Sequence, residues 1–514
     1  MTSRNPFVNM IRAFKCKVAE KPEKSLLLFC SVTSVLWALQ SALQKNILPD
    51  DAVESVCWGA KLQLGYFKHP PLSAWIAYLT ALVTGHCDFF QYLLDSVCTA
   101  VGVWFVYKFA REFFDEKRAA VSAVLLFFVH YYTPPLMVFC PNSVLFALQP
   151  LMAYLFIRAV KWNRPVLWAG FGLVSALAFL GKYSAGLLLV CMAAGMLFHP
   201  IARRRILSIG PWLAAAIFFL AVSPHLWWMY RNDFVTLTYV NGSLKNPDDW
   251  APWIYSLFII GSGLYPLLAE AVVLLLMNLP RHFHRCGVPV CKNALYWSLF
   301  WTIPPLILYA ILSMTGEHVV AMWLATLVSF SGILVVSVFP FRITRRTFRR
   351  LFFVLCAVTA AVMIGISIDL DVRTRDRIHM KPELLLGNVE RFMKANVPGK
   401  TVPCLAGDRG IVNTYEYYHP AHPASFDEFD LILMKKNQKK FDEEGVLLVS
   451  RYGKPLFECM ERIRPGSLDV FKQKKLSCWE VRLECRAPHG KVRRDKEDNP
   501  LVLIWLPPLK EMPE

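Results

Sequence analysis

Long apolar runs recur along the first two thirds of the chain, and short segments between them hold most of the charged residues. A run of about twenty apolar residues is long enough to cross the hydrocarbon core of a bilayer as a helix. The pattern predicts about eleven membrane-spanning helices, some shorter than a full span, at 25–44, 91–110, 119–133, 143–158, 166–181, 184–198, 207–223, 253–279, 293–313, 319–339 and 351–368.

Beyond residue 368 the apolar runs become short and alternate with charged residues and turn formers. Helical periodicity at 383–396, together with short strand-like runs at 431–434 and 446–450, predicts a small soluble α/β domain. We therefore expect an all-α polytopic membrane domain over residues 1–368 and a soluble domain over residues 369–514.

Basic residues predict the orientation of the spans. Clusters such as Arg203-Arg204-Arg205 fall in alternate loops, and cytoplasmic loops carry an excess of Lys and Arg. A cytoplasmic N-terminus with eleven crossings places these clusters inside. A crossing by the apolar stretch 72–85 would invert every later loop, so we expect that stretch to lie along the outer surface as an interfacial helix. The soluble domain then faces outward.

Composition supports the membrane class and limits the partners. The 514 residues are 55% hydrophobic and 18% charged, with a mean hydropathy of +0.38. The net charge of +18 follows largely from the inner loops, so anionic lipid headgroups are better partners for it than nucleic acid. No zinc-type CxxC pair occurs, although Cys404, Cys459, Cys478 and Cys485 could form disulfides outside the cytoplasm.

A short polar segment follows the first predicted span. It contains Asp50, Asp51 and Glu54, and shortly afterwards Lys68 and His69. Carboxylates beside a bilayer cost free energy unless they face water or a bound cation. The segment is therefore predicted to be a catalytic loop on the membrane surface. An ordinary acidic loop that caps a helix is the alternative, and the acids alone do not decide between the two.

Four motifs that include this segment occur in a characteristic order. They are Pro49-Asp50-Asp51, Gly65-Tyr66-Phe67-Lys68-His69-Pro70-Pro71-Leu72, Leu180-Gly181-Lys182-Tyr183-Ser184, and Ser223-Pro224-His225-Leu226-Trp227-Trp228 with Arg231-Asn232-Asp233. In this order they resemble the motifs of bacterial GT-C glycosyltransferases, in the branch that contains protein O-mannosyltransferases, lipid A aminoarabinose transferases and lipopolysaccharide-core galacturonosyltransferases. The resemblance covers about residues 25–340 and, more loosely, the soluble domain.

The resemblance implies an inverting sugar transfer from a polyprenyl-phosphate donor. The acceptor would be a hydroxyl or phosphate of lipid A, lipopolysaccharide, another envelope glycan or a protein, and membrane lipids would be further partners. The location implied is the bacterial inner membrane, with residues 369–514 in the periplasm. Asp50 matches the catalytic aspartate of the family, so we predict that it is the general base for the acceptor.

Two acidic residues beside Asp50 have open roles. Asp51 replaces the glutamate commonly found there, and it would either bind a divalent cation, Mg²⁺ or Mn²⁺, together with Asp50, or cap a helix that starts at Ala52. Glu54 lies on the same helical face. It would complete an acidic pocket or cap the turn.

The predicted phosphate-binding residues are basic. Lys68 stands where relatives carry an acid, and a charged lysine does not ligate a metal, so metal dependence is open. We predict that Lys68, His69, Lys182 and Arg231 bind the donor phosphate. Anchoring in the headgroup layer is the alternative for the two lysines and the arginine.

The predicted substrate-lining residues are Tyr66, Asn142, Tyr183 and His225. Asn142 stands where relatives often have Asp, and it can hydrogen-bond a sugar without supplying charge.

Two other classes of function remain open. A transporter or flippase of lipid-linked glycans would carry ionisable residues near the bilayer midplane and internal repeats, and neither pattern is visible in the sequence. An inactive relative that acts as an assembly subunit would agree with the departures at Lys68 and Asn142. A transfer assay with an Asp50→Asn variant separates the classes, because transport or scaffolding should survive this change whereas sugar transfer should not.

Overall fold

The computed structural model contains two compact units, which are described separately. The first comprises Met1–Trp37, Lys68–Leu72 and Leu93–Met363, and the second comprises Ala38–Phe67, Ser73–Tyr92 and Ile364–Glu514. Within them, the structure describes residues 20–132, 138–243, 251–278, 289–316, 319, 321–339, 342–372, 377–427, 430–451, 453–481 and 501–512.

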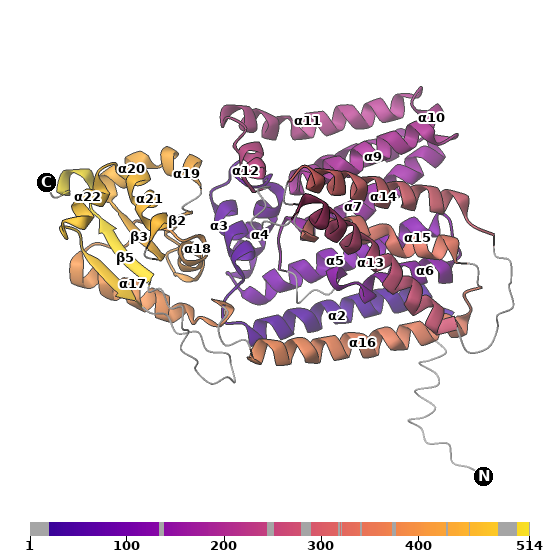
Figure 1. Ribbon diagram of the computed structural model, residues 1–514, viewed down its shortest axis with the longest axis horizontal. Helices are drawn as coiled ribbons and strands as arrows, with labels where there is room; N and C mark the ends of the chain where they lie inside the picture. Colours follow the sequence, from indigo (N-terminus) through magenta and orange to yellow (C-terminus); the bar gives the residue numbers. More distant parts are fainter. Residues whose placement is uncertain are drawn as a thin grey trace, which may run out of the picture. The chain divides into compact units, whose positions relative to one another are not determined.

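The first unit is a bundle of helices (Figure 1). In the described part of the chain, seven helices are long and apolar enough to cross a membrane. They are α2 (Pro22–Gln44), α5 (Asp88–Arg111), α7 (Pro141–Trp162), α11 (Ile209–Arg231), α13 (Pro252–Asn278), α14 (Lys292–Met314) and α16 (Arg345–Val372). Of these, α2, α5 and α16 also contribute residues to the second unit.

Shorter helical elements complete the first unit. They are α6 (Glu116–Leu125), η1 (Leu126–Phe128), η2 (His130–Tyr132), α8 (Pro165–Gly181), α9 (Ser184–Phe198), α10 (Ala202–Arg205), α12 (Val235–Ser243), η4 (Ala321–Leu324), η5 (Leu327–Phe330) and α15 (Ser331–Val338). Each of the eleven segments predicted to span the membrane contains helical structure. The fold class predicted from the sequence is confirmed.

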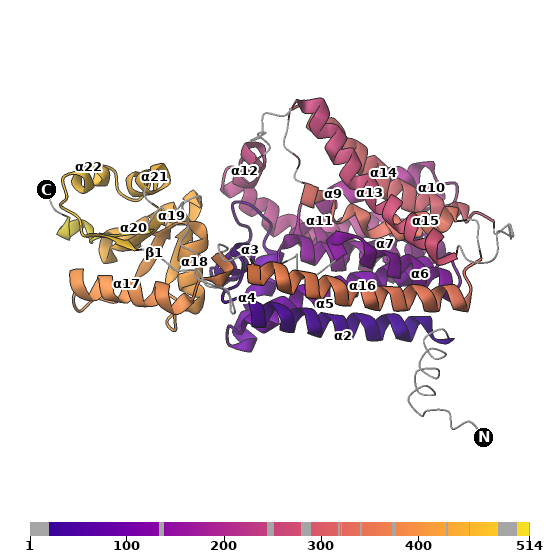
Figure 2. The same ribbon diagram turned by 60° about the horizontal axis from the view of Figure 1, so that its bottom comes forward.

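Small residues allow close packing of the helices that carry the predicted site. A Cβ atom at Gly102 of α5 would lie 2.0 Å from the carbonyl oxygen of Phe146 in α7, and one at Gly172 of α8 would lie 2.4 Å from that of Ala214 in α11. Inside a membrane, where lipid is as apolar as the side chains, such close approach is a main source of helix association. Helices α16 and α2 also lie side by side (Figures 1 and 2), with the rings of Phe352 and Phe29 in edge contact.

The second unit contains a five-stranded mixed sheet in the order β2-β1-β3-β5-β4. Its strands are β1 (Cys404–Gly407), β2 (Ala424–Asp427), β3 (Val446–Arg451), β4 (Cys478–Val481) and β5 (Leu501–Leu506). Strand β1 is parallel to β2 and β3, whereas β5 is antiparallel to β3 and β4.

Helices cover both faces of this sheet (Figure 2). The helical elements of the unit are α3 (Asp50–Ala60), α4 (Leu72–Thr84), η6 (Arg377–His379), α17 (Pro382–Asn396), α18 (Arg409–Tyr418), α19 (Leu431–Lys436), α20 (Gln438–Glu444), α21 (Lys454–Ile463), α22 (Ser467–Lys472) and η7 (Leu509–Glu511). Successive strand residues point to opposite faces. Leu447 accordingly packs with Phe392 of α17, and Leu448 packs with Phe441 of α20.

Two of the three short elements expected in the soluble domain are present. The predicted helix at 383–396 is α17, and the predicted strand at 446–450 is β3. The prediction of a strand at 431–434 is wrong, because these residues form α19. The side chain of Asp430 accepts a hydrogen bond from the backbone N–H of Leu433, and such a cap favours a helix.

The sequence also suggested disulfides and a domain boundary, and both can be compared with the structure. Cys404, Cys459 and Cys478 form no disulfide with one another, and Cys485 lies outside the described residues. The boundary expected at residue 368 lies close to the start of the last segment of the second unit. That unit additionally includes residues 38–67 and 73–92.

Candidate functional site

The acidic turn of α3 belongs to the second unit. Helix α3 begins at Asp50, with Pro49 as the N-cap residue and no side-chain cap. Asp50 and Asp51 therefore lie in the first turn, where carboxylates interact favourably with the positive end of the helix dipole. The helix starts two residues earlier than the capping alternative for Asp51 requires.

An arginine from α18 lies against this turn. The Nη1 atom of Arg409 is 3.3 Å from Oε2 of Glu54 and 3.7 Å from Oδ1 of Asp51. The Glu54 side chain is 5% exposed, whereas that of Asp51 is 61% exposed. Burial by itself would lower the pKa of Arg409, but the negative charges of Glu54, Asp51, Asp427 and Asp50 outweigh it and raise that pKa.

A second ion pair joins the other end of α3 to α18. Lys61 Nζ is 3.0 Å from Oε2 of Glu416, and it also donates to the carbonyl oxygen of Cys57. The same Glu416 oxygen accepts hydrogen bonds from the backbone N–H and the hydroxyl of Ser425. Burial would lower the pKa of Lys61, and the Glu416 carboxylate reverses this and raises it. This buried network stabilises the docking of α3.

Tyr66 is packed inside the second unit. Its side chain is 1% exposed and its ring stacks on Trp58, with centroids 5.2 Å apart. The hydroxyl accepts a hydrogen bond from the backbone N–H of Gln63. Burial raises the pKa of Tyr66.

In the first unit, Lys182 and Asn142 are in contact. Lys182 is the C-cap residue of α8, and its Nζ lies 2.5 Å from Oδ1 of Asn142 in the first turn of α7. The neighbouring Ser143 donates a hydrogen bond to Oδ1 of Asp95, also 2.5 Å away. Asn142 and Asp95 are both buried. The sequence did not single out Asp95, although an ionisable residue within an apolar run is itself a signal of function.

Tyr183 and His225 also come together. The Tyr183 hydroxyl is 2.8 Å from Nε2 of His225, which is 2% exposed. The His225 ring stacks on Trp228. Burial raises the pKa of Tyr183, so this residue is neutral and able to donate a hydrogen bond.

The other predicted basic residues differ in their surroundings. Lys68 is only 6% exposed, and its Nζ lies 5.9 Å from the ring centroid of Tyr239, which is within range of a cation–π interaction. His69 is half-buried. Arg231 is exposed at the end of α11, with its guanidinium over the ring of Trp227.

The acidic turn does not fit a divalent cation in this arrangement. Two of its three carboxylates, those of Asp51 and Glu54, already lie against the guanidinium of Arg409. A metal ion bound to these two carboxylates would have to share their oxygens with the positive charge of Arg409. Among the described residues, no group of three or more His, Cys, Asp or Glu side chains could hold a metal ion.

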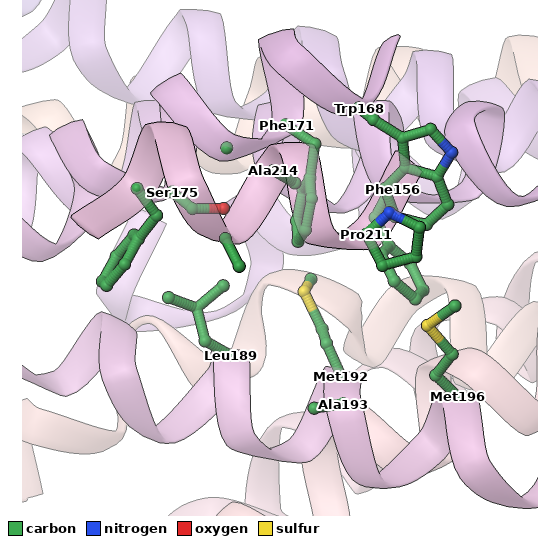
Figure 3. Close-up of a pocket in the computed structure, with 13 residues that line it drawn as sticks. Phe156, Trp168, Phe171, Ser175, Leu189, Met192, Ala193, Met196, Pro211 and Ala214 are labelled. Atoms are coloured by element: carbon green, nitrogen blue, oxygen red, sulfur yellow. The ribbon is translucent and has the colours of Figure 1, made fainter. Parts of the chain in front are cut away.

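An apolar cavity lies between α8, α9 and α11 in the first unit. Figure 3 shows Trp168 and Phe171 on one side of it and Met192 and Met196 on the other. Its volume is about 190 Å³, and no titratable side chain is among the described residues that line it. Such a lining suits a hydrocarbon chain rather than a sugar or a phosphate.

Comparisons with known proteins agree with the motifs. Residues 68–228 match the family model described as dolichyl-phosphate-mannose-protein mannosyltransferase. The lipid A galacturonosyltransferase RgtD of Rhizobium johnstonii is 25% identical over 205 residues, which are 38% of this chain and 40% of that protein. The fold is similar to that of ArnT from Cupriavidus metallidurans in the apo state, with a TM-score of 0.56 at 12% identity over 93% of this chain and 97% of that chain. Residues 68–228 are thus similar to a family of GT-C glycosyltransferases.

The structure of the same ArnT bound to undecaprenyl phosphate gives a TM-score of 0.55 at 13% identity, again over 93% of this chain and 97% of the ArnT chain. These comparisons agree with the superfamily and the glycosyltransferase class predicted from the sequence, over residues 68–228 for the family and over the fold for ArnT. The match with RgtD spans less than half of that protein.

The sequence motifs did not reveal Arg409 and Glu416. Glu54 and Arg409 are 355 positions apart, as are Lys61 and Glu416. No local pattern connects residues at that separation, and a basic or acidic residue in a soluble domain is not unusual by itself.

Proposed function

We propose that this protein is an inverting glycosyltransferase that moves a sugar from a polyprenyl-phosphate donor to lipid A or another lipopolysaccharide component at the outer face of the inner membrane. The activity named for RgtD supports the acceptor class. The complex of ArnT with undecaprenyl phosphate supports the donor class. Other envelope glycans and proteins are alternative acceptors.

The observation that carries the proposal is the contact between Lys182 and Asn142, inside the stretch that matches the family model. A leaving phosphate develops negative charge, and a fixed cation at that point stabilises the transition state. A lysine ammonium has three N–H donors. The contact with Asn142 uses one of them and fixes the direction of the side chain.

In the proposed reaction, Asp50 accepts the proton of the acceptor hydroxyl as its oxygen attacks the anomeric carbon. The bond between that carbon and the phosphate oxygen breaks on the opposite face, so the configuration inverts and polyprenyl phosphate leaves. Asp50 lies in the first turn of α3, where a carboxylate interacts favourably with the helix dipole. Lys182 and Lys68 are proposed to neutralise the phosphate.

Purified full-length protein in liposomes tests the proposal. We expect transfer to lipid A from one of two probes, undecaprenyl-phosphate-linked galacturonic acid or aminoarabinose, and binding of undecaprenyl phosphate by native mass spectrometry. Lys182→Met should weaken both. Lys108→Met is the matched control, because Lys108 is a lysine at a span end that lies over Trp104. Equal losses in the two variants would indicate general anchoring, and absence of both transfer and binding in the unaltered protein would refute the proposal.

A further inference from the structure

Two ion pairs connect α3 to α18, one at each end of α3. At the first turn, Arg409 lies against Asp51 and Glu54. At the last turn, Lys61 lies against Glu416. In each pair the glutamate is nearly buried, with a side-chain exposure of 5% for Glu54 and 7% for Glu416. The pairs are therefore comparable as structural links, but only the first one involves the acidic turn.

The topology of the sheet explains the placement of Arg409. Strand β1 is the central parallel strand, and Arg409 is the first residue of the helix that follows it. In β2, Asp427 lies opposite Gly407, the last residue of β1. The carboxyl ends of neighbouring parallel strands form the edge at which α/β folds bind ligands. In this protein, Arg409 at that edge meets the carboxylates of α3.

The backbone at this edge of the sheet, at the end of β1 and the start of α18, has little conformational freedom. Gly407 has a φ of +135°, and a Cβ atom there would lie 2.3 Å from the carbonyl oxygen of Val449. Asp408 then donates its backbone N–H to that same carbonyl, and its side chain caps α18. The start of α18, and with it the Cα of Arg409, is thus fixed by the sheet.

We propose that Arg409 is a positioning residue that holds the acidic first turn of α3 in its catalytic orientation, which makes the soluble domain part of the catalytic machinery. The inference rests on the proposed function, because the turn carries Asp50, the proposed base. A guanidinium presents several donors in a rigid plane and can meet two carboxylates at once. Arg409 contacts Asp51 and Glu54 on the same face of α3 and thereby fixes the rotation of the turn that also carries Asp50.

Charge supports the same conclusion. Three carboxylates in the first five residues of α3 repel one another. Asp427 of β2 adds a fourth negative charge that interacts with Arg409. Removal of the guanidinium would take an ion-pair partner from the nearly buried Glu54, which is costly for a buried charge. The turn would then have to move toward water, and Asp50 would move with it.

The test compares Arg409→Met, Arg409→Lys and Lys61→Met in the full-length protein in liposomes. We expect Arg409→Met to lower kcat by about tenfold or more, the scale of a small misplacement of a reacting group, with the donor KM changed less than about twofold. Guanidinium ion in the buffer should restore part of the activity, and Arg409→Lys should be intermediate. Lys61→Met breaks the other link between the same helices and should keep kcat within about threefold. Equal losses of kcat in the two methionine variants, or normal kcat in Arg409→Met, would overturn the inference.

Hydrogen exchange separates this inference from the proposed function. Arg409→Met should accelerate amide exchange selectively at residues 51–56, whereas Lys61→Met should not. If the unaltered protein transfers no sugar but this selective change is found, the positioning contact stands and the proposed function fails. If exchange at 51–56 is unchanged, the inference fails even when transfer is observed. If Arg409→Met does not fold, the double variant Arg409→Met/Glu54→Gln also removes the negative charge of Glu54. This double variant then takes the place of Arg409→Met in both measurements.

Discussion

Neighbouring residues in the acidic turn have different surroundings. The side chain of Asp51 is largely exposed and faces Arg409, whereas Asp50 is half-buried at the start of the helix. Both were candidates for the same chemistry on sequence grounds. Because the surroundings of Asp50 and Asp51 differ, we expect substitutions at the two residues to have different effects.

Asp50→Asn should keep the protein level and lower turnover by about 10² or more, the usual scale for loss of a general base. Asparagine has nearly the same shape but does not accept the proton. Asp51→Asn is the matched control and should have a smaller effect, because Arg409 retains Glu54. Near-normal turnover of Asp50→Asn in the liposome transfer assay would move the base to Asp51 or Glu54.

Lys68, His69 and Lys182 give a prediction about metal ions. If they neutralise the donor phosphate, treatment with a chelator should leave appreciable activity. Lys182→Ala and Lys68→Ala should each lower kcat/KM for the donor by about 10- to 100-fold, the equivalent of one hydrogen bond between charged groups. Complete loss of transfer on chelation, restored by Mg²⁺ or Mn²⁺, would show instead that a divalent cation is essential.

Among the elements, α19 shows how one side chain sets local structure. Asp430 is 2% exposed, and one of its oxygens caps the helix. Its other oxygen, Oδ2, is buried without a hydrogen-bond partner among the described residues. Burial accordingly raises the pKa of Asp430 to about 6, although the capping bond opposes this.

This raised pKa predicts a pH dependence of stability. A group whose pKa is higher in the folded state contributes stability below its unfolded pKa, near 3.8, and loses it as the pH rises through 6. At neutral pH the ionised side chain thus costs about 3 kcal/mol. Asp430→Asn keeps the cap and removes the charge, so its gain in melting temperature in detergent should be larger at pH 7 than at pH 5. An equal gain at both pH values would contradict the assignment.

At the scale of the whole molecule, the chain is a multi-pass membrane protein. Its orientation in the membrane is a prediction from the basic loops. The arginine run at 203–205 lies next to Leu207, which is 93% exposed. In the soluble domain, the Lys439 side chain is 85% exposed. Leu207 and Lys439 are therefore accessible positions at which labelling can report on the two sides of the membrane.

Cysteine labelling tests this orientation. The thiols that are exposed among the described residues, Cys87, Cys356 and Cys478, and those outside the described residues, Cys16, Cys286 and Cys485, are replaced by serine. An impermeant maleimide should then label Lys439→Cys in intact spheroplasts. It should label Leu207→Cys only after the membrane is made permeable, because the basic loop is retained in the cytoplasm. The reverse pattern would invert the topology and place the soluble domain in the cytoplasm.

The sequence by itself determined the features that depend on local composition. Hydropathy along the chain gave the membrane class and the helical segments, because transfer into lipid depends on the residues of each segment. Periodicity gave α17 and β3 in the same way, and motif order made Asp50 and Lys182 candidate site residues. The prediction of a strand at 431–434 is wrong because short apolar runs fit either a strand or a helix. The side-chain cap of Asp430 favours the helix.

Only the tertiary structure decided which side chains meet. The contact of Arg409 with Glu54 joins positions 355 residues apart, and that of Lys182 with Asn142 joins positions 40 residues apart. Both depend on how helices and strands pack, and close approach at residues such as Gly102 and Gly407 sets that packing. Hydrophobic periodicity records which face of an element is buried but not against which partner. The counter-ion of the acidic turn was therefore visible only once the chain was folded.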